Sequence, residues 1–177
     1  MRINELFTGT YQTTEMDRSE INDVFRTNTE SIVRAWEVQL PGRPLVWVFI
    51  SKTKNKRGEM LTCDFAQEKF GKFRLDFDQT GAGSPFKVYG AVAQCLRLFI
   101  EESKPDLIKI SGFEEKQEQL YRKILGRAQL PAGYKFYAGP APKGWWYSYN
   151  DFCAIYADGS EFAKALENER GDPEAAS

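Results

Sequence analysis

The chain has 177 residues, of which 42% are hydrophobic and 14% aromatic, and its 24 Lys and Arg nearly balance 25 Asp and Glu. This length suits one domain, and this apolar content excludes a wholly disordered chain. A formal net charge of -1 excludes a global basic field that would hold nucleic acid or an anionic membrane by charge alone. The sequence contains no histidine, which excludes Ser-His-Asp and Cys-His catalysis and removes the commonest zinc ligand.

Three cysteines, Cys63, Cys95 and Cys153, lie far apart in apolar runs and form no Cys-x-x-Cys pair. We expect them to be buried thiols in a reducing compartment. No apolar run approaches about 18 residues, and the first residues lack the hydrophobic region of a signal peptide. The sequence therefore predicts a soluble protein with no membrane partner that is not secreted by its own signal.

The first half of the chain carries strand patterns. Residues 31–40 and 73–77 alternate apolar and polar side chains, and the run at residues 45–50 is apolar throughout. Together with a further run at residues 60–65, these segments predict four antiparallel strands. Residues 1–30 are polar, with a few apolar side chains at helical spacing, and they predict an N-terminal arm or short helices.

The second half alternates helices and strands. Apolar residues from Val88 to Phe99 recur at helical spacing, and Pro105 ends that pattern. The elements expected after it are a strand at 107–110, a helix at 113–128, and strands at 134–137 and 152–156. The order predicts one α+β domain with an α/β-like mixed sheet over residues 31–157. Residues 158–177 predict a short C-terminal helix and a flexible acidic tail, and we expect the last 15 or so residues to have no role in the core.

Short motifs along the chain resemble a known group. They are Met1-Arg2-Ile3-Asn4-Glu5-Leu6-Phe7, Val88-Tyr89-Gly90-Ala91-Val92, Phe99-Ile100-Glu101-Glu102, Lys104-Pro105-Asp106, Ile110-Ser111-Gly112 and Leu120-Tyr121-Arg122-Lys123-Ile124. On these residues the chain resembles small bacteriophage-encoded proteins of largely unknown function, which are similar to the GNAT acyltransferase fold. The resemblance implies a GNAT-like single domain: four antiparallel strands, then helix, strand and helix, then closing strands.

The resemblance also implies a place for acetyl-CoA. In GNAT enzymes the backbone amides of a loop of the type Arg/Gln-x-x-Gly-x-Gly/Ala cradle the pyrophosphate. The counterparts here are Lys87, Gly90 and Ala91, with Gly81, Gly83 and Ser84 upstream as a second source of amides. Val92 stands where the pattern has a small residue, and its bulk is expected to block a phosphate. The alternative is a loop that only connects a strand to a helix.

Catalytic residues follow from the same resemblance. Tyr121 matches the GNAT tyrosine that protonates the departing CoA thiolate, a transfer that a phenol can perform. Asp76 and Asp78, on the wet face of the predicted fourth strand, are the candidates for a general base because no histidine is present. The alternatives are a tyrosine that packs its ring against the sheet and carboxylates that are only solvated.

A basic hairpin is a candidate site for nucleic acid. Lys52, Lys54, Lys56 and Arg57 lie in and beside one predicted turn, where they could grip phosphates. No recognised nucleic-acid motif accompanies them. The alternative is a charged turn that only promotes solubility.

An aromatic cluster is a candidate site for a protein partner. Trp145, Trp146, Tyr147 and Tyr149 follow a Pro- and Gly-containing loop, and exposed aromatic residues on a loop supply large contact area at low entropic cost. The alternative is that they cover the open side of the sheet.

The resemblance implies a phage-encoded protein, and together with these patterns it favours an accessory protein that acts as a binding module without catalysis and without a cofactor. Its partner would be a virion component or a host factor, in the host cytoplasm or the virion. Two alternatives stay open. One is an N-acetyltransferase that uses acetyl-CoA, and the other is a nucleic-acid-binding accessory protein.

Overall fold

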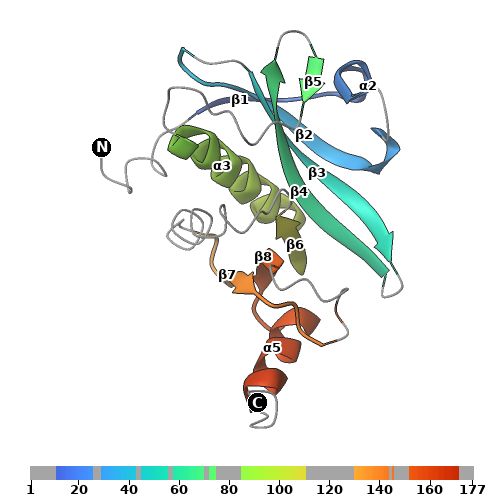
Figure 1. The fold of residues 1–177 in the computed structure, drawn as a ribbon, viewed down its shortest axis with the longest axis vertical. Helices are drawn as coiled ribbons and strands as arrows, with labels where there is room; N and C mark the ends of the chain where they lie inside the picture. Colours follow the sequence, from blue (N-terminus) through green and yellow to red (C-terminus); the bar gives the residue numbers. More distant parts are fainter. Residues whose placement is uncertain are drawn as a thin grey trace.

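The computed structural model shows an α+β protein, as the sequence predicts (Figure 1). The residues it describes are 11–25, 29–42, 45–55, 58–69, 72–74, 85–110, 130–143, 145 and 152–171. Within these residues an eight-stranded sheet is accompanied by three α-helices. The helix expected at residues 113–128 lies outside the described part of the chain.

The strands are β1 (Gln12–Glu15), β2 (Ile32–Gln39), β3 (Val46–Asn55), β4 (Gly58–Lys69), β5 (Lys72–Arg74), β6 (Leu107–Ile110), β7 (Tyr134–Gly139) and β8 (Phe152–Ala157). The helices are α2 (Arg18–Phe25), α3 (Pro85–Ser103) and α5 (Glu161–Gly171), with a 3-10 turn η1 (Thr29–Ser31). The sheet has the order β1-β2-β3-β4-β6-β8-β7, and β5 pairs with the end of β4. All pairs are antiparallel except β4 with β6, which α3 connects.

The main core lies between α3 and one face of the sheet. Alternate residues of β3, among them Val48 and Ile50, are fully buried, because a strand directs successive side chains to opposite faces. The helix presents apolar residues three and four apart, including Ala91, Cys95 and Phe99, to the same core. These two periods explain why the strands and α3 lie where the sequence predicts them.

Two helices lie on the other face, at opposite ends of the molecule (Figure 1). The helix α2 begins at Arg18 because Asp17 and Glu20 form a capping box: the amide of Glu20 donates to Asp17 Oδ1 at 2.9 Å, and the amide of Asp17 donates to Glu20 Oε2 at 2.7 Å. Ile21 of this helix is buried with Met16 and Trp47 in a second, smaller core.

The N-terminal segment belongs to the domain and is more than an arm. Its strand β1 pairs with β2 in register from Gln12 opposite Gln39 to Glu15 opposite Trp36. The first four strands of the sheet are antiparallel as predicted, but β1 is one of them. The strand expected at residues 73–77 is described only over Lys72–Arg74, as a short hairpin partner of β4.

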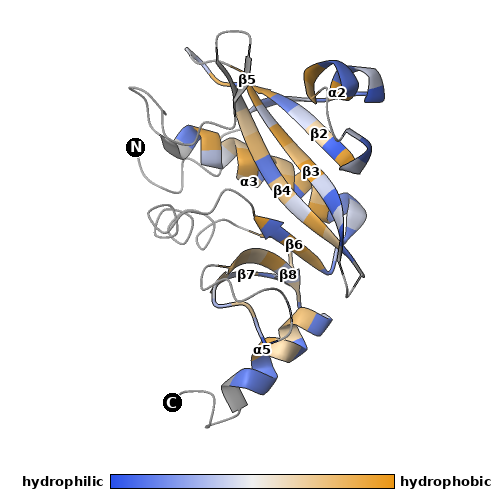
Figure 2. Ribbon diagram, turned by 45° about the vertical axis from the view of Figure 1, so that its right-hand side comes forward, coloured by the Kyte–Doolittle hydropathy of each residue, from blue (hydrophilic) through white to orange (hydrophobic). Residues whose placement is uncertain are grey.

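The C-terminal helix α5 has a core role that the sequence analysis did not expect. Phe162 is fully buried and Leu166 is nearly so, in a cluster with Phe152 and Ala154 of β8. In Figure 2 this helix is hydrophobic near its start and hydrophilic toward its C-terminal end. The short helix is present as predicted, and the expectation that the last 15 or so residues have no core role is wrong at Ala163 and Leu166.

The three cysteines are free and buried, which confirms the prediction that they are buried thiols. Burial raises the pKa of the Cys95 thiol to about 12, and burial also raises the pKa of Cys63 well above its ordinary value. Thiols with such raised pKa values are not thiolates at neutral pH and are poor nucleophiles.

Candidate functional site

A cavity of about 620 Å³ opens at the end of the sheet where β4 and β6 begin, and the start of α5 borders it. Its lining residues come from β3, β4, β6 and the segment before it, the segment between β7 and β8, and the start of α5 with the residue before it. They are Lys52, Glu59, Met60, Leu61, Pro105, Asp106, Leu107, Trp145, Ser160, Glu161 and Phe162. Cavities of this size hold small ligands or protein side chains. We call it the β4–α5 cavity.

The parallel pairing of β4 with β6 brings the apolar floor together. Leu61 lies opposite Ile108 in the ladder, so Met60, Leu61 and Leu107 share one end of the sheet. The chain enters β6 from α3 through Lys104, which has a φ of 45°, and buried Pro105. The amide of Ala157 in β8 donates to the carbonyl of Asp106 at 2.9 Å, which fixes the position of this segment.

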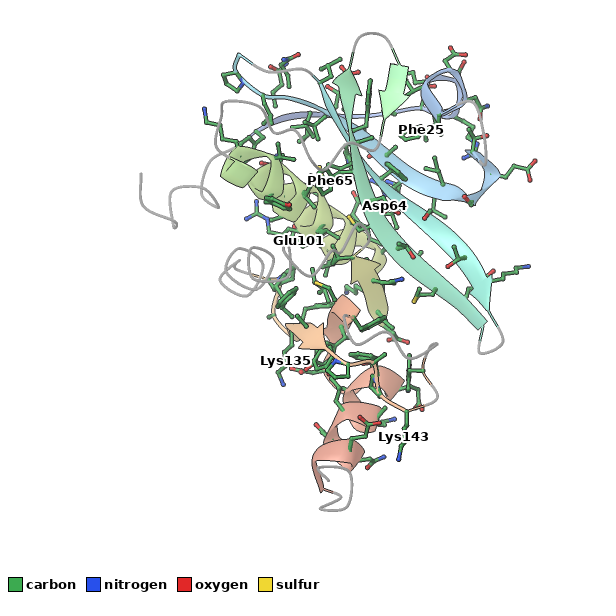
Figure 3. All side chains as sticks on the ribbon, in the orientation of Figure 1. Phe25, Asp64, Phe65, Glu101, Lys135 and Lys143 are labelled. Atoms are coloured by element: carbon green, nitrogen blue, oxygen red, sulfur yellow. The ribbon has the colours of Figure 1, made fainter. Side chains whose placement is uncertain are left out.

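Trp145 forms a wall of the cavity and is held through its ring and its backbone amide, and the segment before it is held separately. Its ring meets Phe162 edge-on, with centroids 5.2 Å apart and planes at 83°. Its amide donates to the carbonyl of Pro142 at 2.9 Å. The amide of Lys143, in the segment beside α5 (Figure 3), donates to a carboxylate oxygen of Glu169. A wall held in this way needs little ordering when a ligand binds.

The start of the same segment is held by Tyr137. Its hydroxyl donates to the carbonyl of Pro140 at 2.6 Å. A Cβ added to Gly139 would lie 2.9 Å from that hydroxyl oxygen, so glycine leaves the room that the hydrogen bond needs.

Ser160 places the start of α5 at the cavity. Its Oγ accepts the amide hydrogen bond of Ala163 at 3.2 Å, which is the N-cap arrangement. Ser160 is the one hydroxyl-bearing residue among the described lining residues, and it is 7% exposed. The Ser160 hydroxyl thus serves as a helix cap, and the described lining residues include neither histidine nor cysteine.

The charges at the cavity are Lys52 against Glu59, Asp106 and Glu161. Lys52 Nζ forms an ion pair with Glu59, and the hydrogen bond from Lys52 lowers the pKa of that carboxyl. Glu161 pairs at 3.1 Å with Lys164, which does not line the cavity. No cation among the described residues pairs with the Asp106 carboxylate. The cavity therefore combines apolar walls with an acidic rim.

The structure brings together two of the residues that the sequence analysis singled out for different functions. Lys52, a candidate for nucleic acid, and Trp145, a candidate for a protein partner, line the same cavity. Lys54 lies on β3 opposite Glu59 and contributes to lowering the pKa of Glu59. Lys56 and Arg57 lie outside the described residues.

The cofactor candidates Lys87, Gly90 and Ala91 lie inside α3, so the expectation of a loop there is wrong. Gly90 and Ala91 are buried, and their amides lie within the helix rather than at a free end. Val92 is 1% exposed and packs in the main core. The Val92 side chain therefore fills the core. It does not decide whether a phosphate can approach, because this segment is a helix and not a phosphate-binding loop.

The remaining candidates lie outside the described residues, so their roles stay predictions. They are Tyr121, Asp76, Asp78, Gly81, Gly83, Ser84, Trp146, Tyr147 and Tyr149.

Sequence reasoning missed Asp106, Leu107, Glu161 and Phe162 as lining residues. The motif Lys104-Pro105-Asp106 was noticed only as part of a resemblance, although a carboxylate next to a proline at the start of a strand signals an exposed strand end. The N-cap role of Ser160 could have been predicted from the sequence, because a serine followed by an acidic residue and then apolar residues is a typical start of a helix.

Comparisons of the chain with protein-family models, with curated proteins and with solved structures find no match. Over the described residues, no helix has the length and apolar character needed to cross a membrane. That part of the chain also has no group of three or more His, Cys, Asp or Glu side chains arranged to hold a metal ion.

Proposed function

We propose that this chain is a phage-encoded, GNAT-like accessory protein that acts by binding another protein, a virion component or a host factor, and not by catalysis. The strand order β1-β2-β3-β4-β6-β8-β7 supports the fold part of this proposal. So does the path from the antiparallel half through α3 into β6 and then to the closing pair β7 and β8, which agrees with the order that the resemblance implies.

The observation that carries the functional part is the β4–α5 cavity with its pinned wall, Trp145. An aromatic residue held by the ring of Phe162 and the carbonyl of Pro142 is a rigid anchor surface, and anchors of this type dominate protein interfaces. The cavity floor is apolar and the rim is charged, which is the usual anatomy of an interface centre and its border.

The second candidate function is an acetyl-CoA-dependent N-acetyltransferase. The crossover from β4 through α3 to the parallel strand β6 favours it, because the resemblance places the coenzyme at the start of that helix. The steric objection based on Val92 does not hold, since Val92 packs in the core. The choice between the two functions therefore rests on a binding measurement.

Calorimetry on the full chain makes that measurement with acetyl-CoA, with CoA, and with an acetylated and amidated tripeptide of glutamine between two leucines. We expect the tripeptide to bind weakly and both coenzymes to be silent at about millimolar concentration. Micromolar binding of acetyl-CoA, together with silence of the tripeptide, would overturn the proposal in favour of the enzyme.

Binding of nucleic acid receives less support. The pairing of Lys52 with Glu59 removes one of the four expected phosphate contacts. Retention of the full chain on a DNA column tests this function. We expect no retention at about 0.15 M salt, because a near-neutral chain lacks the phosphate contacts that produce salt-dependent affinity.

A further inference from the structure

The β4–α5 cavity presents an apolar floor directly beside negative charge. Met60 and Leu107 supply the floor on the face of the sheet that α5 covers, together with Phe162, whereas the side chain of Leu61 packs against the main core on the opposite face. Its volume of about 620 Å³ is large enough for more than one side chain of a bound segment. An occupant must therefore be mostly apolar in the part that enters.

The charged residues at the rim favour a bound group of one charge sign over the other. Lys52 and Glu59 neutralise each other as an ion pair, and Lys164 offsets Glu161 from outside the cavity. The carboxylate of Asp106 remains, with no described cation beside it. A cationic group entering here gains a carboxylate, whereas an anionic group meets the charge of Asp106 and is repelled.

Trp145 adds a second reason for a cation. An indole attracts ammonium and guanidinium groups over its ring, and the strongest such contacts involve tryptophan. Trp145 and Asp106 both line the cavity, so a segment that fills it meets an aromatic wall and a carboxylate. A guanidinium suits this combination well because it stacks on aromatic rings and bonds carboxylates through a planar fork.

We propose that the β4–α5 cavity accepts an arginine or lysine side chain flanked by apolar residues, presented by a segment of the protein partner. This inference rests on the proposed function and names the chemistry of the partner. The apolar flanks occupy the floor formed by β4 and β6, and the positive group lies between Trp145 and Asp106.

Three acetylated and amidated tripeptides test the inference on the full chain, with arginine, glutamine or glutamate between two leucines. Binding is measured by chemical-shift titration of backbone amides. We expect the arginine peptide to bind about tenfold more tightly than the glutamate peptide, with the shifts concentrated at Leu61, Leu107 and Phe162. Added salt should reduce that difference.

Asp106→Asn is the decisive variant, because it removes the charge and keeps the backbone carbonyl that accepts from Ala157. We expect it to weaken the arginine peptide about fivefold and to leave the glutamine peptide unchanged. Asp23→Asn, on exposed α2 at the other end of the molecule, is the matched control and should change neither. Equal melting temperatures of the three proteins show that each is folded.

The outcomes separate the inference from the function it rests on. Equal binding of all three peptides at the cavity, or an unchanged arginine affinity in Asp106→Asn, overturns the preference for a basic residue while the binding function stands. Absence of cavity shifts with every peptide contradicts the binding function itself.

Discussion

Trp145 meets Phe162 edge-on at 5.2 Å, and this contact joins the cavity wall to the most deeply buried ring of α5. Phe162 also contacts Tyr137, Phe152 and Tyr156, with centroid distances of 5.3 to 5.6 Å. Phe162 is therefore the centre of the small core beneath the cavity.

Phe162→Ala should destabilise the protein by about 3 to 5 kcal/mol, because it removes a fully buried ring and leaves a void that neighbouring rings cannot fill. Urea denaturation measures the free energy of unfolding. Phe162→Leu is the control and should lose less than half as much. A loss below about 1 kcal/mol in the alanine variant would show that α5 is not part of the folded core.

Trp145→Ala should cost about 2 kcal/mol, because the ring is only partly buried but packs on Phe162. Trp145→Phe should retain most of the stability and lose part of the affinity for the arginine peptide. Thermal melting and the peptide titration, measured on the same samples, separate the two effects. Melting that is unaffected by Trp145→Ala would contradict the packing described for the cavity wall.

Arg34 links three elements of the sheet's other end. It bonds Glu15 of β1 at 2.6 Å and Glu102 of α3 at 2.6 Å, and its guanidinium lies 5.5 Å from the ring of Trp36. Because both carboxylates are about half exposed or more, we expect Arg34→Met to cost only about 1 kcal/mol and the loss to shrink as salt is added. Glu101→Gln, also exposed on α3, is the control. A loss that is independent of salt would assign the role of Arg34 to packing.

The raised pKa of Cys95 predicts a loss of stability at alkaline pH. Burial raises its pKa from 9.0 to about 12 in the folded protein, so above pH 9 the unfolded chain releases a proton that the folded chain retains. The stabilisation is complete below that value and is lost as pH rises through the window up to about 12. Unfolding free energies of the wild type and Cys95→Ala should therefore converge between these values. Parallel curves would contradict the raised pKa.

Much of the fold was predictable because its signals are local. Alternation located β2, the apolar run at residues 45–50 located β3, and the apolar spacing from Val88 to Phe99 located α3. The strand β1 was missed because Gln12–Glu15 is polar: as an edge strand it gains its stability from pairing with β2, and its pattern shows no buried face. The buried role of Phe162 was missed because two apolar residues in a short acidic helix look like a fraying end.

The site was less predictable, because it joins segments that are far apart in the chain. Trp145 was recognised from its type, but nothing local indicates that Lys52, Asp106 and Ser160 lie around it. The parallel pairing of β4 with β6 brings these residues together, and pairing partners depend on the whole sheet. The loop expected around Gly90 was wrong for a local reason. The match to a cofactor motif was followed there, although the helical spacing of the apolar residues already placed Gly90 inside a helix.

One measurement tests the central claim most directly: a map of the backbone amides that shift when the full chain is titrated with the arginine tripeptide and, separately, with acetyl-CoA. The account predicts shifts at Leu61, Leu107 and Phe162 with the peptide and no shifts with acetyl-CoA. Saturable shifts at the first turns of α3 with acetyl-CoA, and none around the cavity with the peptide, would contradict it.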